Sequence, residues 1–184
     1  MPLRTPHDTE LYTLGRGIVT IATFVGDTPG AYTDVGNCPR FDVNVSEETL
    51  EHYSHRTGTK TRDKVVTLEK NYSIEFDLDE KSRANLAMFL QGTVTGNTIY
   101  GLQANDARYA IKFTSDNAAG ENQIWDFWRV KLSPASAHAL IGDDWSIMSF
   151  SGEGESDETN HSESPYFTVE VQTTTSTTST TTTS

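Results

Sequence analysis

The amino-acid sequence predicts a mainly β fold, in which two packed antiparallel sheets form a sandwich or barrel with one flanking α-helix. Three observations lead to this prediction. About eight short segments carry the β-branched or alternating apolar pattern of strands. Clusters of Gly, Asn, Asp and Pro separate these segments and are typical of turns. Residues 79–91 have the apolar spacing of a helix, and many strands with one clear helix favour a sandwich or barrel.

The first part of the chain begins with a polar stretch and continues with strands. Residues 1–16 are predicted to be an N-terminal arm, because they contain Pro2 and Pro6 and show little periodicity. Residues 17–25 are β-branched and apolar, which predicts a buried strand. Residues 41–45 alternate apolar with polar side chains, which predicts a strand with one buried face.

Residues 47–64 are predicted to form a long exposed loop. Ser46 and the acids that follow it favour a short helical turn at residues 46–49. The segment from His52 to Lys64 has two histidines, four bases, one acid and almost no apolar side chains, so it is not expected in a core.

The clearest alternation in the chain leads into the predicted helix. Residues 65–70 and 72–78 are both predicted to be strands, and the second alternates aromatic or aliphatic residues with polar ones. The helix over 79–91 follows, and Gly92 is suited to end it. Its apolar face is expected to contain Leu86, Phe89 and Leu90.

The second half of the chain is predicted to return to β structure. Residues 133–142 fit either a short helix or a wide connection, and the pattern does not decide between them. Residues 151–164 hold five acids and no Lys or Arg, which indicates a solvated loop. The predicted strands cover residues 109–113, 124–132, 145–150 and 166–171.

These elements are predicted to form one domain over residues 17–172, since 184 residues suit a single domain. Residues 173–184 are nine Thr and three Ser, a low-complexity C-terminal tail. Such a tail has too little apolar surface to fold by itself. Because Thr favours extended structure, our hypothesis is that the tail is a strand-like arm on a neighbouring subunit.

Composition excludes several classes of function. The chain has 26 acids against 14 bases, a net charge of −12, whereas a grip on DNA phosphates requires clustered Lys and Arg. Cys38 is the only cysteine, which excludes internal disulfides. No apolar run reaches the length of a membrane helix, and the first residues lack the apolar centre of a signal peptide. We therefore expect a protein that is in the cytoplasm when it is made, without a membrane partner.

No motif predicts catalysis, so we expect no enzyme, no catalytic residue and no cofactor. The sequence contains no phosphate loop, dinucleotide fingerprint or nucleophile elbow. The spacing of His52 and His55 suits two ligands of one metal, but no further ligand supports a site, and polar contacts are favoured. No metal is expected.

An aromatic cluster leaves two interpretations open. Trp125, Phe127 and Trp128 fit the sugar-stacking platform of a carbohydrate-binding or adhesive β-sandwich. They also fit a strand with Trp125 and Phe127 on its core face and Trp128 on the other, which is the favoured interpretation.

Residues 14–92 resemble siphophage tail tube (major tail) proteins. The resemblance is one of structural residues rather than of a catalytic signature. It is carried by Leu14-Gly15-Arg16-Gly17, Gly36-Asn37, the alternating Phe41 and Val43, Glu48 to Ser54, Gly58, Arg62-Asp63-Lys64, and the helix with Ser82, Asn85 and Leu86. Residues 93–184 have no matching counterpart.

The resemblance implies a fold and an assembly. Tail tube proteins have two packed sheets with a flanking helix and form hexameric rings, whose inner sheets join into a β-lined channel. The rings stack into the tube through which DNA leaves the head, without sequence-specific binding. The resemblance therefore implies a virion protein whose partners are its own copies and other tail proteins, such as the tape measure, terminator and distal tail proteins.

The resemblance also implies where contacts lie. The loop 47–64 would reach the adjacent ring, and its basic side chains suit an acidic surface there. An acidic bore would repel phosphates, and our hypothesis for bore-lining acids is Glu75, Asp77 and Asp106. The secreted tube of a contractile injection system is an alternative with the same fold, and the sequence does not decide whether the tail is contractile. The predicted inter-ring residues are His52, Tyr53, His55, Arg56, Lys60, Arg62 and Lys64.

Overall fold

The computed structural model describes residues 12–172 except 57, 105 and 119, and within them it contains strands and one short helix. Residues 1–11 of the predicted arm and the whole predicted tail, 173–184, lie outside the described residues. The elements are β1 (Gly17–Val25), β2 (Thr28–Pro29), β3 (Thr33–Asp34), β4 (Arg40–Ser54), β5 (Thr61–Leu78), α1 (Arg83–Phe89), β6 (Thr93–Thr95), β7 (Thr98–Tyr100), β8 (Tyr109–Ser115), β9 (Asn122–Pro134), β10 (Met148–Gly154) and β11 (Phe167–Gln172).

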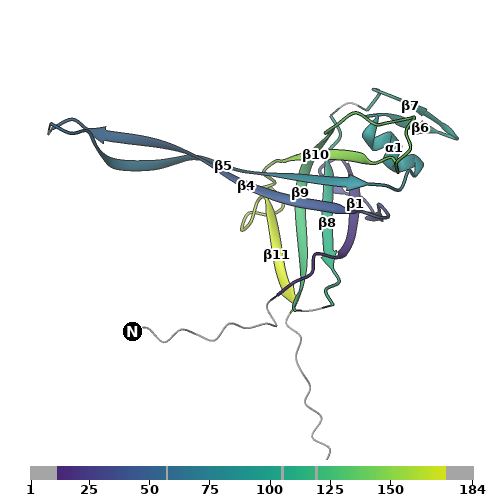
Figure 1. The fold of residues 1–184 in the computed structure, drawn as a ribbon, viewed down its shortest axis with the longest axis horizontal. Helices are drawn as coiled ribbons and strands as arrows, with labels where there is room; N and C mark the ends of the chain where they lie inside the picture. The colour runs from purple at the N-terminus through teal and green to yellow at the C-terminus, as the bar shows by residue number, and fades with distance from the viewer. Residues whose placement is uncertain (1–11, 57, 105, 119, 173–184) are drawn as a thin grey trace, which may run out of the picture.

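The main sheet is antiparallel and has the strand order β2-β1-β8-β9-β10-β5-β4, with β3 on β1 and β11 on β9. Strand β9 is the point where the sheet changes direction. On one edge it pairs with β8, and on the other it pairs first with β11 and then with β10. As a result β10, β5 and β4 cross over β1, β8, β9 and β11 as a second layer (Figure 1). The predicted mainly β class is confirmed, although the layers belong to one folded sheet.

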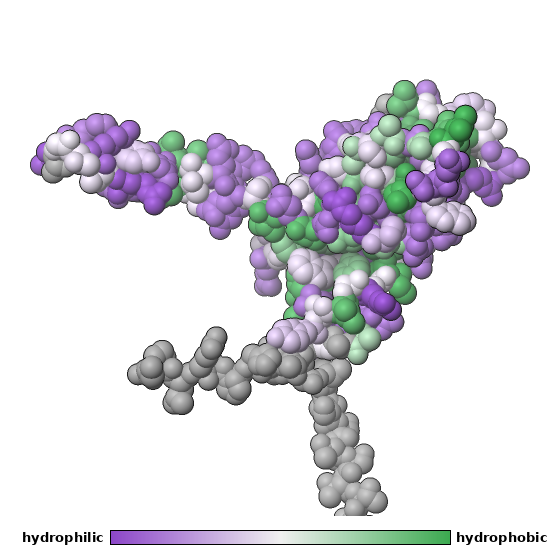
Figure 2. Space-filling view, viewed as in Figure 1, coloured by the Kyte–Doolittle hydropathy of each residue, from purple (hydrophilic) through white to green (hydrophobic). Residues whose placement is uncertain are grey.

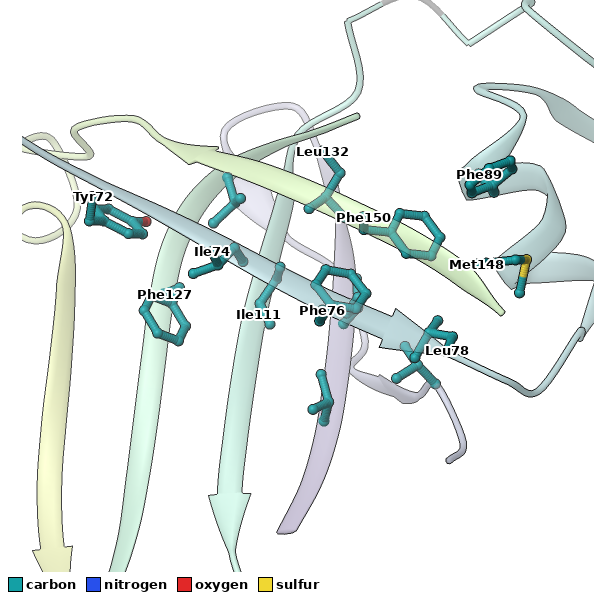
Figure 3. Packing of buried hydrophobic residues seen from close by; sticks show 14 residues of the cluster. Tyr72, Ile74, Phe76, Leu78, Phe89, Ile111, Phe127, Leu132, Met148 and Phe150 are labelled. Atoms are coloured by element: carbon teal, nitrogen blue, oxygen red, sulfur yellow. The ribbon is translucent and has the colours of Figure 1, made fainter. Parts of the chain in front are cut away.

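The core lies between these two layers (Figure 3). The alternation predicted for residues 72–78 is confirmed, because Tyr72, Ile74, Phe76 and Leu78 are all buried while the residues between them are not. Each such side chain contributes roughly 1.5–3 kcal/mol when it leaves water. This alternation fixes the register of β5, since a slip of one residue would move every one of these side chains to the solvent face.

The aromatic cluster on β9 adopts the favoured interpretation. Trp125 and Phe127 stack in the core with ring centroids 6.1 Å apart. Trp128 points to the opposite face, where its ring lies 3.7 Å from that of His161 and its indole N–H donates to the carbonyl of Ser164 at 2.8 Å. The three rings therefore do not form one exposed platform.

Helix α1 lies within the predicted range but is shorter, at seven residues. The Ser82 hydroxyl oxygen accepts the backbone N–H of Asn85 at 3.1 Å and so caps the first turn. Leu90, predicted on the buried face, is the C-cap residue and is 42% exposed. The buried residues of the helix are instead Asn85, Ala87 and Phe89. The Asn85 amide donates to the carbonyls of Val35 at 2.8 Å and Glu80 at 2.9 Å.

Because Asn85 ties α1 to the β3 region, Asn85→Ala is expected to lower the free energy of unfolding by about 1–3 kcal/mol. The truncation removes two hydrogen bonds and leaves the Val35 carbonyl without its amide donor. Urea denaturation monitored by circular dichroism measures the change. Lys81→Ala, at an exposed neighbouring position, is the control and should stay within about 0.5 kcal/mol of the parent. Equal stability of the two variants would contradict this role of Asn85.

The segment 133–165 settles one open alternative and differs from its predictions in two places. Residues 135–147 form an irregular connection, which is one of the two alternatives left open for residues 133–142, although residues 133 and 134 still belong to β9. Strand β10 begins at Met148, later than predicted, and continues to Gly154, inside the segment expected to be a solvated loop. Asp157 in that segment is 6% exposed, and its carboxylate accepts the Asn160 amide at 2.9 Å. The surrounding loop packs over β9, where the His161 ring stacks on Trp128. A purely compositional pattern does not indicate such packing.

Candidate assembly interface

A long two-stranded ribbon projects from the body and is formed by the outer parts of β4 and β5 (Figure 1). We call residues 46–71 the arm. Its strands pair from Ser46 with Asn71 to Ser54 with Thr61. Nine paired residues at about 3.3 Å each give the ribbon a length of roughly 30 Å. The segment 47–64 is therefore a hairpin, and the predictions of a loop there and of a helical turn at 46–49 were wrong.

The sequence of the arm has the pattern of a loop although its structure is β, and the reason is physical. Alternation reveals a strand only where one face is buried. Almost every arm residue is exposed on both faces of the ribbon, so no apolar period is needed. The backbone continues in β structure because the two strands satisfy each other's hydrogen-bonding groups.

Side chains across the ribbon hold it together without a core. Glu51 accepts hydrogen bonds from both Tyr53 and Arg62, and these bonds lower the pKa of the Glu51 carboxyl, with the Tyr53 contact as the larger cause. His52 contacts the carboxylate of Asp63 at 2.6 Å. Such exposed pairs are individually weak, and an isolated hairpin in water is marginal at best. Contact with a further protein surface would therefore stabilise the arm.

The tip of the arm is positively charged. Arg56, Lys60 and Lys64 are exposed and make no ion pair within the described part of the chain. The Lys60 ammonium lies 4.4 Å from the centroid of the Tyr53 ring. The structure places all seven predicted inter-ring residues on this outer half of the arm, and their contact with another ring stays a prediction. They are His52, Tyr53, His55, Arg56, Lys60, Arg62 and Lys64.

The middle of the arm also carries apolar side chains that the sequence analysis did not assign to an interface. Leu50 and Val66 are directly opposite each other and are 60% and 43% exposed. Leu68 is 57% exposed and lies at a β-bulge between the pairs Glu48–Glu69 and Thr49–Thr67. Bulges increase the local twist of a ribbon, so these side chains turn relative to the body.

The sheet has free edges besides the arm. No strand in the described part of the chain pairs with the outer edge of β4 or with the edge of β11 that faces away from β9. Such edges present unpaired backbone N–H and C=O groups and are templates for pairing with another chain.

The predicted bore-lining acids lie in two separate places. Glu75 and Asp77 share one face of β5, where both contact the guanidinium of Arg40, Asp77 at 3.7 Å. Asp106 precedes β8 and contacts Arg108 at 2.7 Å and Lys131 at 3.2 Å. Hydrogen bonds from these two bases, Arg108 first, lower the pKa of Asp106. All three acids are therefore partly compensated, and their place in a bore stays a prediction.

The rest of the body is acidic because its bases are already paired. Each of the four bases between residues 101 and 172 has a carboxylate within 4.0 Å. They are Arg108, Lys112, Arg129 and Lys131. The range 101–172 also contains 12 acids, which is more than these four bases can pair with, so uncompensated acids remain on the surface.

Two features of the described residues bear on metal binding and on nucleophilic chemistry. They contain no group of three or more His, Cys, Asp or Glu side chains arranged to hold a metal ion. Burial raises the pKa of the Cys38 thiol to about 11, which keeps it protonated and a poor nucleophile near neutral pH. None of the helical structure in the described residues is long and apolar enough to cross a membrane.

Fold and surface together define a mainly β protein whose distinctive feature is a projecting arm rather than a pocket. The chain belongs to the family described as "Protein of unknown function UCP028589", which it matches over residues 12–100 and 95–170. No curated protein matches it in sequence.

Several solved structures are similar to the chain. A chain of the extended sheath–tube complex of an extracellular contractile injection system (PVC) has a TM-score of 0.39 and 15% identity, over 85% of this chain and 88% of that one. A chain of the sheath/tube terminator of that system has a TM-score of 0.41 and 11% identity, over 86% and 96%. A chain from the tail of an empty GTA particle has a TM-score of 0.39 and 10% identity, over 73% of this chain and 89% of that one.

Proposed function

We propose that this chain is a structural subunit that assembles with its own copies into the tube of a phage-like tail. In the full form of the proposal, hexameric rings stack into a siphophage tail tube, and the tube is the channel for DNA ejection. The chain is not an enzyme and uses no cofactor. The observation that carries the proposal is the arm, which lies within the region that resembles tail tube proteins, residues 14–92.

The exposure of the arm supports a role in assembly. Its strands pair with each other over nine residues on each side and contribute nothing to the core. A ribbon of this kind loses conformational entropy on ordering, at roughly 1–2 kcal/mol per residue for the backbone, and recovers little by burial. Contact with a neighbouring copy would supply the missing burial. In a stacked tube, that neighbour belongs to the adjacent ring.

Ring formation is supported by the free sheet edges. Joining β4 or β11 to a strand of the next subunit would satisfy the unpaired backbone groups of both chains. Such a contact uses different surfaces on the two partners, and a contact of that type closes into a ring when the rotation between subunits permits it. The sixfold symmetry rests on the resemblance.

Charge supports both stacking and passage of DNA. The basic tip of the arm complements the acidic body, which favours contact between copies. An acidic wall has no clustered bases with which to hold phosphates, so DNA would pass without being bound. In a virion the further partners would be the tape measure, terminator and distal tail proteins.

Electron microscopy of the purified full chain tests the proposal. Negative staining over a range of protein concentrations is expected to show sixfold rings and stacks of rings. Sedimentation velocity of the same samples measures the mass of the assemblies. Protein that stays monomeric at high concentration, or assembles with another symmetry, would sink the proposal.

The alternatives predicted from the sequence separate by other observations. The carbohydrate-binding or adhesive module loses its main support, because Trp125 and Phe127 pack in the core while Trp128 stacks on His161. A secreted tube of a contractile injection system would use the same arm and edges. Particles isolated from the host separate that alternative from a virion tail, since a virion tail is attached to a DNA-filled head.

A further inference from the structure

The end of the body opposite to the arm carries a loop with exposed apolar side chains. We call residues 139–145 the distal loop. Its residues Leu140, Ile141 and Trp145 are 88%, 97% and 95% exposed. Single apolar residues on a surface are ordinary, but three large ones gathered on one loop are typical of a docking surface.

The base of the distal loop is fixed to the body. The Ser146 hydroxyl donates to the carbonyl of Ala139 at 2.8 Å, which brings the two ends of the loop together. The His138 ring packs on Phe89 of α1, with ring centroids 5.5 Å apart. Because its base is held in this way, the loop presents its apolar side chains outward instead of folding them into the core.

The distal loop is also acidic. Asp143 and Asp144 lie between Ile141 and Trp145, and both are exposed. Neither forms an ion pair with any described residue, and residues 139–147 include no Lys or Arg. A partner for this surface should therefore combine an apolar patch with positive charge.

The arm has that combination. Leu50, Val66 and Leu68 form an exposed apolar patch in its middle, where Figure 2 shows hydrophobic side chains between the hydrophilic tip and the body. Lys60 and Lys64, toward the tip, have no acid paired with them in the described residues. Both the apolar and the charged parts of the two surfaces are complementary.

The two surfaces lie at opposite ends of one strand, β5. Met148, which follows the distal loop, pairs with Leu78 at the C-terminal end of β5, whereas the arm is the N-terminal part of β5 (Figure 1). The strand has 18 residues and therefore spans roughly 60 Å. A single copy cannot place its arm on its own distal loop, so the complementary surface must come from another copy.

We propose that the arm of one copy docks on the distal loop of the next copy, with the apolar patch on Leu140, Ile141 and Trp145 and the basic tip beside Asp143 and Asp144. This contact rests on the proposed function and names the surface that receives the arm. Since the two partners use different surfaces, the contact is head-to-tail and is repeated by every added copy.

Charge reversal on both surfaces tests the contact. Asp143→Lys/Asp144→Lys and Lys60→Glu/Lys64→Glu are each expected to raise the protein concentration needed for half-assembly at least tenfold, because like charges then face each other. An equimolar mixture of the two variants is expected to recover assembly, since each arm then meets a distal loop of opposite charge. Sedimentation velocity measures both effects, and recovery in the mixture excludes a mere loss of folding.

Two further variants keep the test specific. Glu158→Lys/Glu163→Lys reverses two exposed acids on another loop, changes the net charge equally, and is expected to assemble as the parent does. Trp145→Ser is expected to weaken assembly without changing the melting temperature, because this side chain is 95% exposed in the single chain. Assembly that is unaffected by Trp145→Ser and by both reversals would overturn the contact.

The outcomes also separate this contact from the proposed function. If both charge-reversal variants form sixfold stacked rings at the same protein concentration as the parent, the contact is overturned and the proposed function is unaffected. Assemblies without sixfold rings that respond to both reversals, and recover in the mixture, would support the contact and overturn the tube. A parent chain that stays monomeric overturns both.

Discussion

A chain in which residues 53–63 are replaced by Asn-Gly is expected to fold normally and to form no stacked assemblies. The two new residues join His52 and Lys64, which face each other in the ladder, and Asn-Gly is the turn that best joins two paired strands. The replacement removes the exposed tip with Arg56 and Lys60 and leaves every core residue in place. Its effect on the unfolding free energy is therefore expected to stay within about 1 kcal/mol.

The loss of assembly should be complete in the concentration range where the parent chain stacks, because no other described segment projects from the body as the arm does. Electron microscopy counts stacks, and thermal denaturation confirms the fold. Lys81→Glu provides a control, since it changes the charge of an exposed base that lies next to α1 instead of on the arm. Stacks of normal length from the shortened chain would refute the role of the arm.

The parts of the fold that follow from the sequence are those in which one face of an element is buried. Residues 17–25 were predicted as a strand and form β1 with the same bounds, because β-branched apolar residues favour a strand. The prediction that this strand is buried holds only for its middle, since Ile18 and Val25 are exposed. The alternation at 72–78 identified the core face of β5, because one face of that segment is buried. Strands β2 and β3, at two residues each, are too short to leave any period in the sequence.

The candidate interface was predictable in its composition and not in its shape. The excess of bases in residues 52–64 marked the segment as exposed and suited to an acidic partner. Its form as a ribbon depends on pairing between residues up to about 25 positions apart, such as Ser46 with Asn71, which leaves no local pattern when both faces meet water. The partners of Glu75 and Asp106 likewise depend on register and on loop positions, so their compensation by Arg40 and Arg108 could not be read from the sequence.

The distal loop is a second place where the sequence pattern does not predict the structure. Trp145 and Ile147 were included in a predicted strand because their spacing resembles the alternation of β structure. The structure begins β10 only at Met148 and leaves Trp145 95% exposed. The residue type is the same whether an apolar side chain packs in the core or contacts a partner, so only the folded structure distinguishes the two roles.

Two residues of β5 test this distinction between core and interface. Phe76→Ala is expected to lower the free energy of unfolding by about 3–5 kcal/mol, because the ring is fully buried and its loss leaves a cavity. The Phe76 ring stacks on Phe150 with centroids 4.8 Å apart and also lies 5.9 Å from the ring of Phe41. These two rings belong to the neighbouring strands β10 and β4 of the same layer, so the truncation breaks the aromatic packing across that layer. The melting temperature should fall by roughly 6–20 °C.

Leu68→Ala is the matched control, since it truncates a large apolar side chain on the same strand where that side chain is 57% exposed. Its unfolding free energy is expected to change by less than about 0.5 kcal/mol. Urea denaturation of both variants at low protein concentration, where assembly does not contribute to stability, measures the difference. A Phe76→Ala variant within about 1 kcal/mol of the parent would contradict the folded-sheet core, because only a closed second layer over β8 and β9 makes this ring so costly to remove.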